Sequence, residues 1–431
     1  MGLGSGMMKC FAMMLVGTIG WSLFASNTQA AQVNSGSRLE VLDPSEIGIS
    51  AEKLAKVDRA MEDSIRQNRI AGGIVVIARG GKVGHFKSYG KMDLEANKPM
   101  QNDAIFRIYS MSKSVTSAAA LMLYDEGKLH FNDPVSKYIP ELKNVQVADG
   151  DKLVPVSREI TVGDLMLHTA GYSYGDSKQD AHNEAYAELK MLDTSVTLEE
   201  FGKKLGQLPL AFQPGTDWKY GISIDVLGRV VEVASGKTLE EFFCTRIFEP
   251  LGMSDTGFYV PAEKIERFAA NYNSDGKGEL TLLDDPRKSR YLIKPPFFGG
   301  GGGLVSTATD YTRFLMMIAN GGELDGERLL KPETVKLMTT NRVPKEAGWV
   351  KFGDEIRTGV GFGFGFNVRD EMSDWDPQGR VGEYGWGGAA STHYWVSPKD
   401  DLIVVTLEQI MPYSFMTETK IKGLVFDAIE K

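Results

Sequence analysis

The stretch Phe106-Arg107-Ile108-Tyr109-Ser110-Met111-Ser112-Lys113 decides how this chain is interpreted. Its first part belongs to an extended apolar segment (104–109), and its second part opens a helix pattern that reaches residue 126. A serine and a lysine three residues apart lie on one face of a helix, about one turn from each other. The spacing therefore predicts a hydroxyl nucleophile, Ser110, with a built-in base, Lys113, directed back toward it.

Ser-x-x-Lys is a short pattern, and it occurs three more times here, beginning at Ser50, Ser88 and Ser274. Ser50 starts a helix with its own apolar stripe, so helix capping explains it. Ser88 lies in a strand-like run and Ser274 in a polar stretch. Ser110 alone stands between an extended segment and a long apolar helix pattern. On this motif by itself, an N-cap of a core helix remains the alternative for Ser110.

The composition is that of a soluble globular enzyme. The chain has 431 residues, of which 42% are hydrophobic and 24% charged, enough for one large domain or two closely associated ones. Its formal net charge of −9 argues against nucleic acid and against an anionic membrane surface as partners.

The N-terminal residues 1–30 predict a secretory signal peptide. Lys9 precedes an apolar run (10–25), and Thr28-Gln29-Ala30 offers a cleavage site of the small-x-small type. The protein is thus expected to be exported, to the periplasm or beyond the cell, and to have no membrane attachment after cleavage; an uncleaved N-terminal anchor is the alternative. Cleavage leaves Cys244 as the single cysteine, so no internal disulfide is expected.

Strand patterns occur at both ends of the chain, around a middle part rich in helix patterns. Residues 73–79 and 83–89 predict one hairpin, and residues 393–396 and 402–409 predict another. Residues 361–368 alternate glycine with phenylalanine, which predicts a strand with one aromatic face. Helix patterns of the middle part cover residues 162–167, 181–191 and 224–234.

This order predicts an α/β fold of the α+β type, in which one antiparallel sheet is built from both chain ends and flanked by helices. We expect an α/β subdomain made of residues 43–109 and 297–431. Residues 110–296 would form a mostly helical subdomain, with the active site at the interface of the two.

Two further segments carry candidate chemistry. Tyr220 follows a turn (214–219) and precedes a helix, and a phenol beside a lysine at a helix entrance can relay protons. The glycine-rich segment 385–389 lies ahead of a strand, where backbone N–H groups can face a developing oxyanion. A half-buried structural tyrosine and an ordinary glycine turn are the alternatives for these two segments.

Several other patterns are less convincing. Ser173 lies in a Gly-x-Ser-x-Gly sequence, but the preceding residues 161–169 predict a helix, whereas a nucleophile elbow requires a strand there. The glycine run 299–303 lacks the end of a phosphate-binding loop, and we interpret it as close backbone packing. His168 and His393 are interpreted as structural residues, because the five histidines are scattered and form no zinc motif. Neither a metal nor a cofactor is expected.

Together these segments resemble the serine β-lactamase and penicillin-binding-protein superfamily in its class C branch, and most closely the bacterial carboxylesterases of family VIII. The likeness covers roughly residues 42–426 and implies the β-lactamase/transpeptidase-like fold. Six stretches carry it in the family's order: 106–113, 160–171, 212–236, 251–256, 300–315 and 385–398. The resemblance implies that Ser110 is the acylated nucleophile and Lys113 its base partner. It also matches Tyr220 to the tyrosine of Tyr-x-Asn, which passes protons to the leaving group and to the deacylating water.

The resemblance also assigns the segment Trp386-Gly387-Gly388, which takes the place of the family's Lys-Thr/Ser-Gly triplet. Ala389 follows it directly. The resemblance implies that the N–H groups of Ser110 and Ala389 form the oxyanion hole, with the triplet in contact with the substrate.

Two departures from the β-lactamase pattern bear on the substrate. Ile222 stands where β-lactamases have the asparagine of Tyr-x-Asn, and Trp386 replaces their lysine. Each lost charge-assisted hydrogen bond is worth about 1.5–3 kcal/mol, so the two together cost on the order of 10²-fold or more in discrimination. The substitutions predict a site for neutral acyl groups, with Ile222 and Trp386 in contact with the substrate.

We therefore expect a serine carboxylesterase that hydrolyses small-molecule esters with short acyl chains, with side activity on cephalosporin-type β-lactams. A class C-like β-lactamase or a D-amino-acid peptidase on the same scaffold is one alternative. A non-catalytic exported binding or scaffold protein with this fold is another.

Overall fold

The computed structural model describes residues 39–175, 184–186 and 193–430. The predicted signal peptide lies outside the described residues, as does most of the predicted helix 181–191. Residues Gly36–Lys431 group into one compact unit. In the described part of the chain, no helix is both long enough and apolar enough to cross a membrane.

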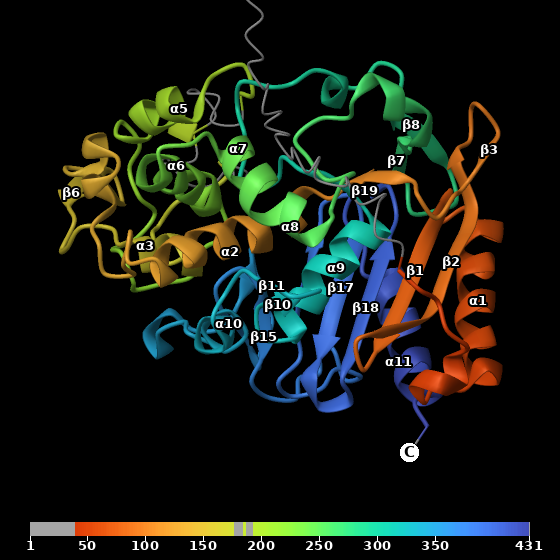
Figure 1. Ribbon diagram of the computed structural model, residues 1–431. Coiled ribbons are helices and arrows are strands. Elements are labelled where there is room, and N and C mark those ends of the chain that lie inside the picture. Colours follow the sequence, from red (N-terminus) through yellow and green to blue (C-terminus); the bar gives the residue numbers. More distant parts are fainter. Residues whose placement is uncertain (1–38, 176–183, 187–192, 431) are drawn as a thin grey trace, which may run out of the picture. The chain divides into compact units, whose positions relative to one another are not determined.

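An eight-stranded sheet organises this unit, with the strand order β14-β15-β16-β17-β18-β1-β2-β3 (Figure 1). All its neighbouring strands are antiparallel, and β1 pairs with β18 from Ile74↔Leu407 to Arg79↔Leu402. The predicted antiparallel sheet from both chain ends is thereby confirmed. The strands are β1 (Gly72–Arg79), β2 (Lys82–Asp93), β3 (Lys98–Pro99), β14 (Val360–Phe362), β15 (Asn367–Arg369), β16 (Tyr384–Gly388), β17 (Thr392–Ser397) and β18 (Leu402–Leu407).

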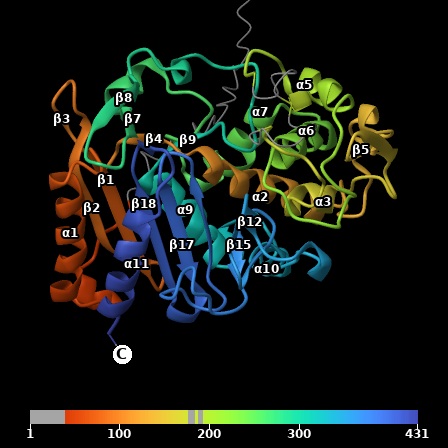
Figure 2. The same cartoon turned by 180° about the vertical axis from the view of Figure 1, so that it is seen from behind.

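Both faces of the sheet are covered by helices, which explains why β1 is apolar at nearly every position. Side chains alternate along a strand. Val75 and Ile77 belong to the core shared with α1 (Ala51–Arg66) and α11 (Met416–Ala428), whereas Ile74 and Val76 belong to the core shared with α2 (Ser112–Asp125) and α9 (Ala308–Ala319). Figure 1 shows α9 in front of the sheet, and the reverse view in Figure 2 shows α11 in front of the other face.

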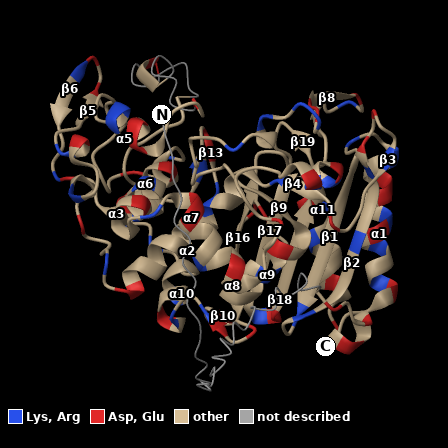
Figure 3. Cartoon of the chain, turned by 45° about the horizontal axis from the view of Figure 1, so that its top comes forward, with Lys and Arg blue, Asp and Glu red and all other residues tan. Residues whose placement is uncertain are grey.

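Helix α1 follows the expected amphipathic pattern. Ser50 is its N-cap, with the side-chain oxygen accepting a hydrogen bond from the Lys53 N–H at 3.4 Å, so this copy of Ser-x-x-Lys is a cap as predicted. Leu54 and Val57 are buried against the sheet. Basic and acidic residues are interspersed along the helix, as Figure 3 shows.

The remaining helices gather mainly around α2, whose central residues are fully buried. α2 lies against α6 and α7, and α6 also contacts α3 and α5. The helices outside the sheet layers are α3 (Val162–Leu167), α5 (Leu198–Leu205), α6 (Ser223–Ser235), α7 (Leu239–Phe243), α8 (Glu249–Leu251) and α10 (Pro332–Met338). The short strands are β4 (Ile105–Arg107), β5 (Gln146–Asp149), β6 (Lys152–Pro155), β7 (Asn271–Ser274), β8 (Leu280–Asp284), β9 (Val305–Thr307), β10 (Glu323–Leu324), β11 (Glu327–Arg328), β12 (Lys351–Phe352), β13 (Glu355–Ile356) and β19 (Ile410–Met411).

The prediction of one strand over residues 361–368 is wrong. The chain turns back on itself there, and β14 and β15 pair as a hairpin. Gly365 has a φ of +91°, a conformation that favours glycine, and a Cβ atom there would lie 2.8 Å from Ser117 of α2. The alternation of glycine and phenylalanine therefore serves a tight turn against α2, with all three phenylalanines buried.

Glu408 follows β18 and is a buried carboxyl group whose Oε1 atom has no hydrogen-bond partner. Burial raises its pKa from 4.5 to about 8, partly offset by a hydrogen bond to Thr417 of α11. At pH values between 4.5 and about 8, the Glu408 carboxyl of the native protein keeps its proton, whereas the same carboxyl in the unfolded chain loses it. The native state then binds more protons, so its stability falls as pH rises toward about 8.

We expect Glu408→Gln to remove this pH dependence, because the amide is uncharged and similar in shape. At pH 8.5 the variant should exceed the wild type in free energy of unfolding by about 2–4 kcal/mol, since each pKa unit is worth about 1.4 kcal/mol. At pH 5 the two should be nearly equal. Urea unfolding at both pH values measures this, with the exposed Glu333→Gln as control. If the difference in free energy of unfolding between Glu408→Gln and the wild type does not increase from pH 5 to pH 8.5, the raised pKa of Glu408 is contradicted.

Candidate active site

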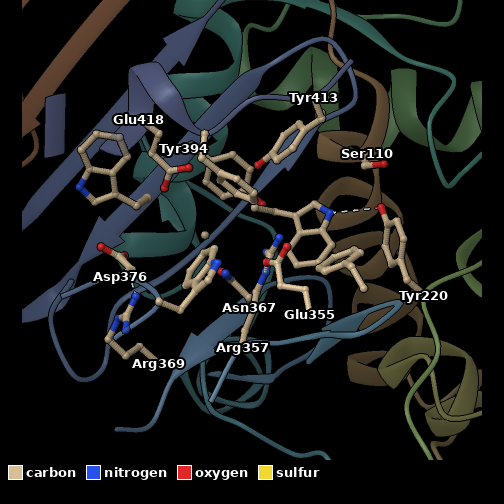
Figure 4. Close-up of a pocket in the computed structure, with 18 of the residues that line it drawn as sticks. Ser110, Tyr220, Glu355, Arg357, Asn367, Arg369, Asp376, Tyr394, Tyr413 and Glu418 are labelled. Carbon is tan, nitrogen blue, oxygen red and sulfur yellow. Dashed lines mark hydrogen bonds and ion pairs between the residues drawn. The ribbon is translucent and has the colours of Figure 1, made fainter. Parts of the chain in front are cut away.

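Ser110 lies in a short 3-10 turn (Tyr109–Met111) between β4 and α2. The helix begins two residues later than its first expected position, at Ser112. Tyr109 has a φ of 40°, in the left-handed region that residues other than glycine rarely adopt. Such strain costs on the order of 1–3 kcal/mol and recurs at functional sites. Here it accompanies an abrupt change of direction that leaves Ser110 in the wall of a pocket (Figure 4).

Lys113 is fully buried, and its ammonium nitrogen contacts three oxygen atoms. The Nζ atom lies 3.1 Å from Oγ of Ser110, 3.0 Å from the hydroxyl of Tyr174 and 2.5 Å from the carbonyl oxygen of Gly301. In its protonated form the amine has three hydrogens, which these contacts would use, and in its neutral form it can accept the Ser110 hydrogen instead. The structure thus joins Ser110 and Lys113 by a direct hydrogen bond.

A second layer of contacts holds the Gly301 carbonyl in place. The N–H of Gly301 donates to the Asp225 carboxylate of α6 at 2.8 Å. Asp225 is buried; desolvation raises the pKa of its carboxyl, while the nearby charge of Lys113 lowers it. A Cβ atom on Gly301 would lie 2.3 Å from Asp225, so only glycine fits this position. The glycine run 299–303 is therefore close backbone packing, as predicted, and it supports Lys113.

Tyr220 lies just before α6 and beside Lys113. The ring centre of Tyr220 is 4.7 Å from Nζ of Lys113, and its hydroxyl accepts a hydrogen bond from Nε1 of Trp386 at 3.4 Å (Figure 4). Among the described residues, no hydrogen bond joins the Tyr220 hydroxyl to Ser110 or Lys113. Tyr220 therefore contacts Lys113 with its aromatic ring, and its hydroxyl oxygen contacts Trp386.

Tyr174 is the residue at this site that the sequence analysis did not identify. It lies in an irregular loop after α3, without helix or strand periodicity, and the neighbouring Ser173 drew attention instead. Ser173 is buried, and its Oγ accepts a hydrogen bond from the Gly175 N–H at 3.0 Å. No strand precedes it, since α3 ends at Leu167, so the nucleophile elbow is absent from this described segment, as expected.

Strand β16 approaches the Ser110 turn closely. A Cβ atom at Gly388 would lie 2.3 Å from the carbonyl oxygen of Ile108, two residues before Ser110. Glycine at this position therefore lets the strand lie directly against the turn. Ala389 follows the strand and lines the same pocket as Ser110. The two residues predicted to supply the N–H groups of an oxyanion hole therefore line the same pocket.

The pocket has a volume of about 440 Å³. The predicted substrate contacts Trp386, Gly387 and Gly388 line it, together with Ser110, Tyr174 and Tyr220. In Figure 4, Ser110 and Tyr220 lie at one end and Asp376 and Arg369 at the other.

Ile222 is placed differently from what the resemblance implied. Its side chain is fully buried in the hydrophobic core, with 0% relative exposure to solvent. Ile222 is not among the residues that line the described pocket. Burial of the isoleucine side chain in the hydrophobic core, just before α6, is more favourable in free energy than a position in a pocket wall, because it removes more apolar surface from water. Ile222 therefore lies behind the site.

The described residues 39–175, 184–186 and 193–430 contain no group of three or more histidine, cysteine, aspartate or glutamate side chains arranged to hold a metal ion. The Ser110 end of the pocket instead combines a serine, the buried lysine that contacts it, two tyrosines and the backbone of β16. These groups can carry out acyl transfer by nucleophilic catalysis.

A family model described as Beta-lactamase matches residues 57–422. The chain belongs to the beta-lactamase family. Protein Rv1367c of Mycobacterium tuberculosis (strain ATCC 25618 / H37Rv) is 37% identical over 352 residues, covering 80% of this chain and 86% of that protein. Esterase EstB of Burkholderia gladioli is 31% identical over 389 residues, covering 85% of this chain and 93% of the esterase.

A solved structure is similarly close. EstCE1, described as a hydrolase with promiscuous acyltransferase activity, matches with a TM-score of 0.76 at 30% identity, covering 87% of this chain and 99% of that chain. The family match and these esterase relatives confirm the predicted superfamily and fold. The protein is a serine hydrolase of the beta-lactamase family.

Proposed function

We propose that this serine hydrolase is a carboxylesterase that cleaves small esters through an acyl-enzyme on Ser110. The observation that carries the proposal is the 3.1 Å hydrogen bond between Ser110 Oγ and Lys113 Nζ at the wall of a pocket. A serine becomes a competent nucleophile when an adjacent base takes its proton. Lys113 is the group in position to do so.

In the proposed first step, the neutral amine of Lys113 takes the Ser110 proton while Oγ attacks the ester carbonyl. The N–H groups of Ser110 and Ala389 stabilise the oxyanion. When the tetrahedral intermediate collapses, the C–O bond to the alcohol breaks and the alcohol leaves with the proton from Lys113. Tyr220 and Tyr174, which flank Lys113, are suited to pass that proton.

In the second step, water gives its proton to the same groups and attacks the acyl carbonyl, which releases the acid and restores Ser110. An alcohol in place of water would give acyl transfer to that alcohol, and EstCE1 is described as a hydrolase with promiscuous acyltransferase activity. We also propose that the enzyme acts outside the cytoplasm after residues 1–30 are removed.

A β-lactamase or a D-amino-acid peptidase is the second candidate, on the strength of the family match. Trp386 favours the esterase. By the resemblance, Trp386 stands in the place of the lysine of β-lactamases; its indole lines the pocket, and its N–H donates to the Tyr220 hydroxyl. The pocket thus lacks a lysine at the position from which β-lactamases bind the substrate carboxylate.

Parallel assays of 4-nitrophenyl butyrate and nitrocefin at equal enzyme concentration test this proposal. We expect kcat/KM for the ester to exceed that for nitrocefin by about 10²-fold or more, from the loss of two charge-assisted hydrogen bonds. Aryl esters from acetate to decanoate should show a preference for short chains. Faster hydrolysis of nitrocefin than of every ester would contradict the proposal.

A further inference from the structure

The end of the pocket far from Ser110 is charged, although the substitution at Trp386 suggested a site for neutral groups. Four carboxylates line it, and each has a partner on the protein. Glu355 pairs with Arg357, and Asp376 with both Arg369 and Lys422.

Lys422 of α11 also serves the other two carboxylates. Its Nζ atom lies 2.6 Å from Glu383 and 3.4 Å from Glu418, and Glu418 is further 3.3 Å from Nδ1 of His393. The acceptors of this end of the pocket are therefore engaged by groups of the protein itself.

The donors are not engaged in the same way. The Arg357 guanidinium lies among three aromatic rings, with ring centres 4.2 Å away for Phe352, 4.4 Å for Trp375 and 4.7 Å for Phe415. Its side chain is only 8% exposed, and its Nε donates to Glu355, which is itself half exposed. Within the described part of the chain, its two terminal amino groups make no hydrogen bond. The rings hold the charge in place and leave the forked end of the guanidinium free.

Two other residues that line the pocket also carry donors without a partner in the described part of the chain, although these atoms are buried. Nε and Nη1 of Arg369 and Nε1 of Trp395 are buried and have no partner among the described residues. Buried polar groups are normally hydrogen-bonded, so unpaired donors beside carboxylates that each lie close to a cation or a histidine favour an anionic ligand for this end of the pocket. In Figure 4, Arg357 and Asn367 lie between the Ser110 end and the Asp376–Arg369 end.

We propose that this end of the pocket binds a carboxylate on the ester substrate, with Arg357 as its main partner. A planar guanidinium edge matches a carboxylate with two parallel hydrogen bonds. The inference rests on the proposed esterase function and names its substrate class, esters that carry a free carboxylate away from the scissile bond. The four carboxylates that line the pocket outnumber its three cationic side chains by one, so the net charge of the lining does not attract an anion. Recognition of the substrate carboxylate therefore depends on the directed hydrogen bonds of the unpaired donors.

Matched esters test this with the unmodified full-length protein. One set varies the acyl side at equal length: mono-4-nitrophenyl adipate, its neutral methyl ester, and cationic 4-nitrophenyl 6-aminohexanoate. The other set varies the alcohol side: the butyryl ester of 4-hydroxyphenylacetate and its neutral methyl ester. We expect kcat/KM for the carboxylate substrate to exceed that for its neutral twin by about 10-fold or more in one set, mainly through KM, as one or two charge-assisted hydrogen bonds allow. The set in which the carboxylate substrate is preferred shows whether the natural ester carries its carboxylate on the acyl side or on the alcohol side.

Variants then assign the preference to Arg357. In Arg357→Gln the ratio of carboxylate to neutral twin should fall to about 1, and in Arg357→Lys, which keeps the charge without the fork, it should fall partway. Arg246→Gln is the matched control, since Arg246 also lies over an aromatic ring and pairs with a glutamate, but outside the pocket. Its ratio should equal that of the wild type.

The outcomes separate the two proposals. Turnover of the neutral twins without preference for the carboxylate, or with preference for the cationic ester, overturns the carboxylate site and leaves the esterase proposal intact. A preference that survives unchanged in a folded Arg357→Gln also overturns it. Hydrolysis of none of the esters overturns the esterase function and the carboxylate site with it.

Discussion

Replacing Ser110 by alanine is expected to lower kcat/KM for 4-nitrophenyl butyrate by about 10³-fold or more. The reason is chemical: the variant has no oxygen on which an acyl group can be carried, while the pocket and its backbone N–H groups remain. A spectrophotometric assay measures the loss. A fluorophosphonate probe measures it independently, because the variant should no longer be labelled at position 110.

Ser173→Ala is the matched control for this experiment. It removes the serine of the other hydrolase-like motif, which is buried and hydrogen-bonded within its own loop. Activity within a few-fold of the wild type is expected, although the variant can melt at a lower temperature. If Ser110→Ala retained full activity and Ser173→Ala lost it, the nucleophile would have to be reassigned.

Replacing Lys113 by methionine is expected to lower kcat by about 10³-fold, with KM changed much less. General-base assistance typically contributes about 10²–10⁴-fold, and Lys113 is the base in direct contact with the nucleophile. Methionine fills most of the same buried volume without a charge. Steady-state kinetics and the rate of fluorophosphonate labelling should fall together, since both need an activated Ser110.

Two comparisons make the Lys113→Met result specific. The exposed Lys336→Met on α10 should keep wild-type kinetics. Far-ultraviolet circular dichroism should show the same helix content for both variants. Rapid labelling of Lys113→Met by the probe would show that another group activates the serine, with Tyr174 and Tyr220 the candidates from their positions.

Local sequence patterns were sufficient for much of the fold. The hairpins at the two chain ends, the helix after Ser110 and the cap at Ser50 are set by contacts within a few residues, which periodicity and capping describe well. The hairpin 360–369 was missed because a strand and a tight glycine turn share an alternating pattern. Only the fit of Gly365 against α2 distinguishes them.

By itself, the sequence determined the pair at the centre of the site, because Ser110 and Lys113 are one helical turn apart and their meeting depends only on local geometry. The signal peptide remains a prediction from residues outside the described structure. Tertiary structure alone decided the rest: Tyr174 and Gly301 as partners of Lys113, Trp386 as partner of the Tyr220 hydroxyl, and the unpaired donors around Arg357. These contacts join segments tens to hundreds of residues apart, so the sheet and its helices bring them together, and no spacing along the chain encodes them.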